Sequence, residues 1–322
     1  MDALERIICG PAGALAERAT VRAAHLAPDG MRGLGPVARA LAPRLLGRDL
    51  VLDAGAGVRL SVPGTPDLVD GYLTGRPHRL EPETRHLLDR AVERGDVVLD
   101  VGANVGYYAF RAAAASGPGG AVHAFEPQAR LRPHLERSLA INRGRERAPV
   151  HLYSRAVSDR DGERVALHLG SGPVEVASVL PHEWLAGGAT EEVLTTTLDA
   201  RLGGASADVV KIDVEGHELA VLRGFQQTLA ARPPALIVAE ALPRRMSFVS
   251  IPGDGPFTRA PTTPPPSRVA ELLASFGYRL CRITRRGRLV ADIGAGDLDR
   301  VARPTNVAFL HRDAPRAGRL SA

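Results

Sequence analysis

The chain has 322 residues, of which 44% are hydrophobic and 24% charged, a composition typical of a soluble globular protein. No stretch approaches the roughly 20 consecutive apolar residues of a membrane span, and Met1–Asp29 lacks the apolar core of a secretory signal. Cys9 and Cys281 form no paired motif. We therefore expect a cytoplasmic protein without membrane contact. The net charge of +5 comes from arginines spread over the whole length, with Lys211 as the single lysine, and only 4% of residues are aromatic, which does not favour nucleic-acid binding.

The first 80 residues form a segment of different character from the rest. Helical patterns at 3–24 and 37–46 are separated by glycines and prolines, which predicts two short helices joined by a turn. Residues 49–76 look like a small β element. We therefore expect 1–80 to be an N-terminal extension of helices and a β-hairpin, acting as a lid or as a homodimer contact, and the sequence does not choose between the two.

A glycine-rich turn at Gly55–Gly57 resembles a nucleotide-binding turn but is followed by the wrong element. Val58–Pro63 alternates apolar and polar residues and ends at a proline, which indicates a strand. A nucleotide-binding turn requires a helix at this position, because helix amides and the helix dipole bind the ligand. Leu50–Ala54 and Val58–Val62 are therefore predicted to form a β-hairpin.

From about residue 82 onward, strand-like and helix-like segments alternate, which is typical of a parallel sheet with crossover helices. We predict that 81–315 form one α/β domain. The expected strands are 97–101, 121–126, 150–154, 208–212, 235–239, 278–283 and 306–310, the expected helices are 107–116, 128–142, 215–229 and 268–276, and 163–169 and 192–198 are expected as hairpin or edge strands. The proline-rich segment 243–266 is either a disordered insert or a loop over the carboxyl edge of the sheet.

A second glycine turn lies between a predicted strand and a predicted helix, as nucleotide binding requires. Gly102 and Gly106 allow the backbone to pass close to a ligand. Asn104 occupies the position where a dinucleotide site needs a bare glycine, and Asp100 adds a negative charge that repels phosphate. S-adenosylmethionine carries a sulfonium, an ammonium and no phosphate, so this turn suits it better than a dinucleotide. Glu126 ends the next strand and is placed to accept both ribose hydroxyls.

A series of short motifs runs through the α/β region: Val98–Tyr108, Ala124–Pro127, Ala156–Asp159, Thr197–Asp199, Lys211–Glu218, Val221–Gly224 and the strand that ends at Glu240. In its order and spacing this series resembles the FkbM-type methyltransferases, over about residues 80 to 242. The resemblance implies a Rossmann-like class I methyltransferase fold, with a seven-stranded, mostly parallel sheet and helices on both faces. It also implies O-methylation of a small-molecule acceptor, a sugar or natural-product hydroxyl.

Carried over position by position, the resemblance also assigns cofactor-binding residues. Asp100, Gly102, Asn104 and Gly106 would hold the methionine part of S-adenosylmethionine, and Glu126 would hold the ribose. Ser158 and Asp159, which follow the third strand, would flank the adenine.

The segment Lys211–Glu218 carries the candidate catalytic groups, because the carboxyl ends of parallel strands face the ligand crevice. Methyl transfer to an alcohol needs alignment of the reacting atoms and removal of the hydroxyl proton. Asp213 would face the cofactor or the acceptor, Glu215 and His217 would begin the next helix, and the lone Lys211 would supply a point charge. His217 is the candidate general base, because the intrinsic pKa of histidine lies closest to neutrality. Structural alternatives stay open: Asp213 as a helix N-cap, Glu215 and Glu218 as partners of the helix dipole, and His217 as a structural histidine.

A metal-assisted variant is a further alternative, because Asp213 and Glu240 end adjacent strands and two carboxylates there could hold Mg²⁺. We do not favour it and expect no resident metal. A nicotinamide-dependent oxidoreductase is disfavoured by Asp100 and Asn104 and by the lack of a tyrosine four residues before Lys211. A non-catalytic nucleoside-binding or partner-binding protein is disfavoured by the polar groups that follow Lys211.

Overall fold

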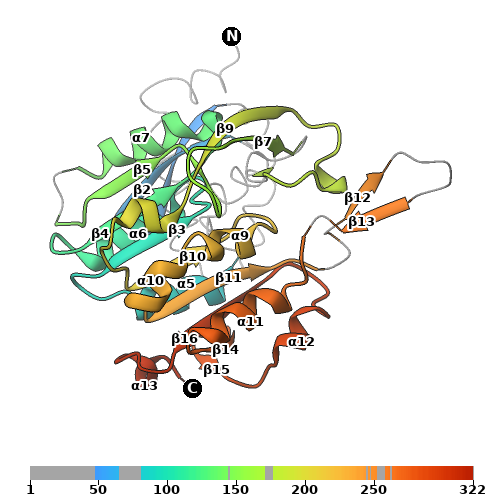
Figure 1. Ribbon diagram of the computed structural model, residues 1–322. Helices are drawn as coiled ribbons and strands as arrows, with labels where there is room; N and C mark the ends of the chain where they lie inside the picture. Colours follow the sequence, from blue (N-terminus) through green and yellow to red (C-terminus); the bar gives the residue numbers. More distant parts are fainter. Residues whose placement is uncertain are drawn as a thin grey trace, which may run out of the picture.

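A mixed, mostly parallel β-sheet forms the centre of the protein in the computed structural model (Figure 1). The structure describes residues 48–64, 81–143, 146–170, 177–243, 246, 248–251, 258–261 and 263–321, so the predicted helices 3–24 and 37–46 lie outside the described residues. In spatial order the strands are β15 (Leu289–Val290), β14 (Tyr278–Ile283), β16 (Thr305–His311), β11 (Leu236–Ala241), β10 (Val209–Ile212), β3 (Val97–Val101), β4 (Ala121–Phe125) and β5 (Val150–Tyr153). Six of these strands run in the same direction, and β16 and β15 run in the opposite direction.

The strand order of this sheet reverses at β3. From β3 the chain moves outward through β4 and β5 and then returns to β10 on the other side of β3. Such a reversal leaves a crevice beyond the carboxyl ends of the two central strands. All seven predicted strands are confirmed, but the sheet has an eighth member, because the chain turns at Gly287 (φ +68°) and the two residues of β15 pair with the end of β14. So short a strand shows no alternation in a sequence.

Helices cover both faces of the sheet, and the alternation along β3 shows which residues face which layer. Leu99 and Val101 belong to the cluster formed with α9 (Glu218–Arg223), α10 (Gln226–Ala231) and α11 (Ser267–Ser275). Val98 belongs to the cluster on the opposite face, with α5 (Pro82–Ala91) and α6 (Tyr107–Ser116). The remaining short helices are α8 (Leu198–Leu202), α12 (Ala295–Leu298) and α13 (Ala317–Leu320). Within the described ranges, no helix has the length and apolar character to cross a membrane.

Two predicted helices differ from the structure. The segment 128–142 begins with a 3₁₀ turn, η1 (Ala129–Leu131), before α7 (Arg132–Ile141). The helix predicted at 215–229 is wrong at its start, because Glu215 (φ +54°) and Gly216 (φ +97°) are left-handed and α9 begins only at Glu218. Gly224 then separates α9 from α10.

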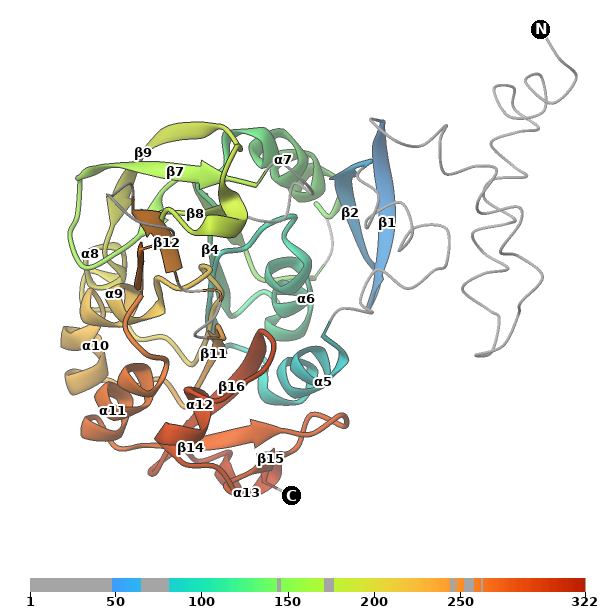
Figure 2. The same cartoon turned by 90° about the vertical axis from the view of Figure 1, so that its right-hand side faces the viewer.

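The predicted N-terminal hairpin is confirmed as β1 (Asp49–Gly55) paired with β2 (Val58–Pro63). It packs on α6 and α7 through a buried cluster of its own that includes Leu52, Val58, Phe110 and Leu135 (Figure 2). The Ser61 amide also donates to the Ser138 hydroxyl at 2.8 Å. The hairpin is thus anchored to the α/β fold, and its role as lid or dimer contact stays a prediction.

The strands predicted at 163–169 and 192–198 lie in a second sheet rather than at the edge of the first. This sheet has the order β6 (Ala156–Val157), β9 (Thr190–Thr196), β7 (Arg164–Leu169) and β8 (Ala177–Ser178), and β7 and β9 pair antiparallel. The turn η2 (Glu183–Leu185) follows β8 and contacts β12 (Phe248–Ile251). β12 pairs with β13 (Thr258–Pro261), so the described parts of the proline-rich segment include a hairpin.

Candidate active site

The glycine turn between β3 and α6 adopts a backbone that only glycine allows at two positions. Gly102 has φ +80°, and a Cβ there would lie 1.8 Å from the carbonyl oxygen of Asp213. Gly106 has φ +84°, and a Cβ there would lie 2.7 Å from the Phe110 ring. Asn104, at φ +53°, is of a residue type that tolerates this conformation. The predicted order of strand, tight turn and helix is confirmed, and the backbone runs close to the end of β10.

Glu126 follows β4 and ties two loops together beneath this turn. One of its carboxylate oxygens accepts the amide of Asn104 at 2.8 Å and the other accepts the amide of Gln128 at 2.9 Å. Burial raises the pKa of Glu126 to about 7, and the two amides offset only part of this shift. Because each carboxylate oxygen has a second lone pair, the side chain can still accept hydrogen bonds from a ligand diol.

Asp100 and Lys211 lie side by side on β3 and β10, on the face covered by α5 and α6. Asp100 is 1% exposed and neither of its carboxylate oxygens has a hydrogen-bond partner. Burial raises its pKa to about 6 despite the nearby ammonium. The Lys211 ammonium lies 2.9 Å from Asp213 Oδ2 and 5.0 Å from the centre of the Tyr108 ring. Burial alone would lower the pKa of Lys211, but the surrounding carboxylates raise it, so this cation is permanent.

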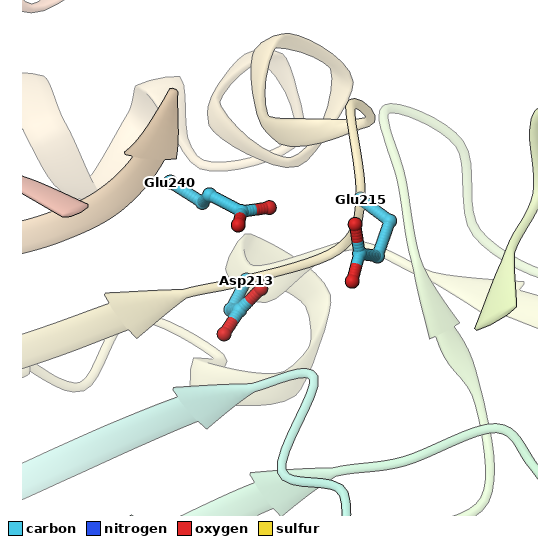
Figure 3. A group of neighbouring side chains, drawn as sticks. All are labelled: Asp213, Glu215 and Glu240. Atoms are coloured by element: carbon cyan, nitrogen blue, oxygen red, sulfur yellow. The ribbon is translucent and has the colours of Figure 1, made fainter. Parts of the chain in front are cut away.

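Three carboxylates meet at the carboxyl edge of β10 and β11, and we call them the acid trio: Asp213, Glu215 and Glu240 (Figure 3). One oxygen from each lies within 4.8 Å of the others. Burial and then the Asp213 charge raise the pKa of Glu215 to about 8, and the same two causes raise the pKa of Glu240 well above its ordinary value. Glu240 Oε2 is buried and accepts no hydrogen bond. Because neighbouring carboxylates repel one another when ionised, such a group tends to share a proton or to bind a cation.

The structure changes the interpretation of several residues in the loop from 213 to 218. The predicted proximity of Asp213 and Glu240 is confirmed, whereas Asp213 is not an N-cap, because α9 is preceded by His217. Glu218 does more than complement a helix dipole, because its Oε1 accepts the amides of Val214 at 3.2 Å and Gly216 at 3.1 Å. Burial raises the pKa of this carboxyl to about 7. Glu218, the first residue of α9, therefore fixes the loop that precedes this helix.

His217 points to the loop after β6 and makes its hydrogen bond there. Its Nε2 lies 2.9 Å from the Ser158 hydroxyl, which is also 3.3 Å from Asp159 Oδ1. Burial lowers the pKa of His217, so the ring is neutral near pH 7. The structure thus joins His217 to the two residues expected to flank the adenine.

Sequence reasoning missed several residues that complete the site. Glu81 accepts hydrogen bonds from the Tyr108 hydroxyl at 2.9 Å and from Asn306 Nδ2 at 2.7 Å, and so links α5, α6 and β16 behind Lys211. Ser178 and His182 contact the loop after β10. Tyr108 lies in a motif noticed in the sequence, but nothing in the spacing pointed to the other residues.

Comparison with known proteins identifies a family model, the methyltransferase FkbM domain, that matches residues 100–280, more than half of the chain. Among solved structures, the chain is similar to an FkbM methyltransferase from Methylobacillus flagellatus KT (15% identity, 85% of this chain and 58% of that chain, TM-score 0.38). It is also similar to an S-adenosylmethionine-dependent O-methyltransferase from Thermotoga maritima (13% identity, 83% and 78%, TM-score 0.39). No curated protein matches the chain.

Proposed function

Because the chain belongs to the FkbM family of methyltransferases, which use S-adenosylmethionine, we propose that it methylates a hydroxyl oxygen of a sugar or another secondary metabolite. The observation that supports the proposal is the acid trio, because its carboxylates lie at the carboxyl edge of the sheet, where ligands of such folds bind and where an acceptor hydroxyl would need a base. S-adenosylmethionine supplies a methyl group already activated on a sulfonium. The protein must therefore bind S-adenosylmethionine and the acceptor, align the acceptor oxygen with the methyl carbon, and deprotonate the acceptor hydroxyl.

The residues around the glycine turn suit this ligand. Gly102 lets the glycine turn pack directly against the loop after β10, since a Cβ there would clash with the Asp213 carbonyl, and this close packing brings the turn next to the acid trio. Glu126 offers two carboxylate oxygens to the ribose hydroxyls while its amide contacts hold it in place. Asp100 and the acid trio are carboxyl groups whose ionised forms a nearby cation would stabilise, which favours a sulfonium and an ammonium over phosphate. His217 and Ser158 form the adenine end of the site, and His217 is then a binding residue rather than the base.

In the proposed reaction, the acceptor oxygen attacks the methyl carbon as the bond from that carbon to sulfur breaks, and the hydroxyl proton passes to the acid trio. A carboxylate whose pKa lies near neutrality is suited to this role. Glu215, with a pKa near 8, and Glu240 are the members best able to take up a proton. Lys211 balances part of the negative charge through Asp213 and keeps that carboxylate oriented.

The same geometry supports a second candidate, a Mg²⁺-assisted form of the reaction. Three carboxylate oxygens within 4.8 Å of one another are suitable ligands for a divalent cation. In that form the cation would lower the pKa of the acceptor hydroxyl, and the trio would bind metal instead of the proton. Turnover that is lost in chelator and restored by Mg²⁺ would establish this form, and full turnover in chelator would eliminate it.

Two experiments test the proposal. Calorimetric titration with S-adenosylmethionine, S-adenosylhomocysteine and NAD should show binding of both adenosyl ligands and not of NAD. Incubation with methyl-labelled S-adenosylmethionine and a panel of hydroxylated sugars and natural products should give a product that gains one labelled methyl group on oxygen, detected by mass spectrometry. Methylation at nitrogen or carbon, or binding of NAD alone, would contradict the proposed function.

A further inference from the structure

Glu215 reaches the acid trio from a backbone conformation that its own sequence does not favour. Its φ is +54°, in the left-handed region that residues with a long side chain rarely adopt, and Gly216 follows at φ +97°. A strained residue persists only where its surroundings hold it in place. The contacts of this peptide therefore show what keeps the carboxylate at the site.

Two buried side chains, Ser178 of β8 and His182 just before η2, contact the carbonyl oxygen of Glu215. The Ser178 hydroxyl donates to it at 2.9 Å, and His182 Nε2 lies 2.8 Å from it. Because a carbonyl can only accept, His182 must carry its proton on Nε2. Ser178 and His182 are 1% and 2% exposed, so the neighbouring packing holds both donors in place.

The peptides on either side of Glu215 are fixed as well. Glu218 accepts the amides of Val214 and Gly216, as described above. Gly216 is closely enclosed, since a Cβ there would lie 2.6 Å from Thr263 Cγ2 and 3.2 Å from His182 Nε2. The surrounding contacts therefore allow a single conformation of this segment, and Ser178 and His182 provide part of those contacts.

Electrostatic repulsion explains why the Glu215 carbonyl needs these hydrogen bonds. The carboxylate of Glu215 faces Asp213, Glu218 and Glu81, and Lys211 is the cation that offsets them in part. Like charges repel, and a carboxylate on a surface loop gains free energy by turning toward water. A fixed carbonyl prevents the loop from rotating the side chain outward.

We propose that Ser178 and His182 are positioning residues, which hold the Glu215 carboxylate in the acid trio through its backbone carbonyl. The inference rests on the proposed function, in which the acid trio faces the reacting sulfonium. It assigns a role in the active site to the segment that carries β8 and η2.

The ratio of two ligand affinities measures this effect without knowledge of the methyl acceptor. S-adenosylmethionine and S-adenosylhomocysteine differ by one methyl group and one positive charge, so a carboxylate near the sulfur raises the affinity for the first relative to the second. Measured at pH 9, where a carboxyl with a pKa of about 8 is ionised, Glu215→Gln should lower this ratio about tenfold. Ser178→Ala and His182→Leu should each lower it severalfold, and Ser178→Ala should have no further effect in the Glu215→Gln background, because the carboxylate to be positioned is gone.

Thr195→Val is the matched control, because Thr195 is a buried residue of β9 in the same sheet. Its hydroxyl donates to the Arg160 carbonyl at 2.7 Å and accepts the Glu163 amide at 3.0 Å. This variant should lose thermal stability as Ser178→Ala does, yet keep the ratio of the wild type. A lowered ratio in Thr195→Val would mean that the ratio reports general weakening of the sheet, and would overturn the inference.

The remaining outcomes separate the inference from the function on which it rests. An unchanged ratio in Ser178→Ala and His182→Leu, with a lowered ratio in Glu215→Gln, would overturn the positioning role and leave the proposed site intact. An unchanged ratio in Glu215→Gln would remove Glu215 from the neighbourhood of the sulfonium, and the positioning role would fall with it.

Discussion

Protonation of Glu126 should control how tightly the protein binds its cofactor. The pKa of this buried carboxyl is raised from 4.5 to about 7, so the folded chain retains a proton that the unfolded chain would release between those two values. The proton-linked contribution to stability is therefore fully present below about pH 4.5 and is lost as the pH rises through 7. It amounts to about 3 kcal/mol in total.

The ribose hydroxyls should bind the ionised form, since only a carboxylate accepts hydrogen bonds with both oxygens. At pH 5.5 only about 3% of a group with a pKa near 7 is ionised, compared with about 90% at pH 8. We therefore expect the affinity for S-adenosylhomocysteine to fall about 30-fold between pH 8 and pH 5.5. Titration calorimetry in buffers of different ionisation enthalpy should also detect the release of nearly one proton per ligand bound at pH 5.5.

Glu126→Gln is the variant that tests this assignment, because its side-chain oxygen can still accept one of the two backbone amides. Glu126→Ala would remove the carboxylate that accepts the amides of Asn104 and Gln128, at about 1–3 kcal/mol for each lost hydrogen bond. The Gln variant should bind S-adenosylhomocysteine more weakly and without the slope in pH. If the affinity of the wild type did not change with pH, the reasoning would be refuted. If the pH dependence persisted in Glu126→Gln, it would have to be assigned to another group, and Asp100, whose pKa is about 6, would be the first candidate.

Three further predictions follow from the geometry of the site. Gly102→Ala should abolish ligand binding or prevent folding, whereas Gly95→Ala, at φ +89° with open space around it, should cost only about 1–2 kcal/mol in urea unfolding; equal losses would contradict the close-approach argument. His217→Ala should weaken binding of S-adenosylhomocysteine and spare turnover at saturating S-adenosylmethionine, and the reverse result would make His217 the base. Glu240→Gln replaces a carboxyl group that has a buried oxygen without a hydrogen-bond partner. The variant should raise the apparent Tm by about 2–4 °C and lower the rate of methyl transfer. An unchanged Tm would show that burial of this carboxyl group does not destabilise the protein.

The sequence predicted those parts of the fold and site that depend on local patterns. The strand, glycine turn and helix around Gly102 form a continuous segment, and the apolar run of each central strand is itself visible in the sequence. The close placement of Asp213 and Glu240 followed from the order of two parallel strands. Such features need no knowledge of what packs against them.

Glu215 shows why the remainder was not predictable. The residues from 215 to 229 have a helical pattern, and local propensity favoured a helix that begins at Glu215. Contacts from Ser178 and His182, more than thirty residues earlier, instead hold the carbonyl of Glu215 and delay the helix to Glu218. Tertiary contacts therefore override propensity at the very residue that completes the acid trio.

The raised pKa values also bear on the direction of the proposed reaction. Asp100, Glu126, Glu215 and Glu240 each hold a proton more tightly than free side chains do, chiefly because they are buried. A cationic ligand in their midst would favour the ionised forms and bind more tightly for that reason. On the proposed function, transfer of the methyl group converts the sulfonium into a neutral thioether, and this attraction is lost at the moment the product forms. These carboxylates would therefore favour release of S-adenosylhomocysteine and its exchange for S-adenosylmethionine.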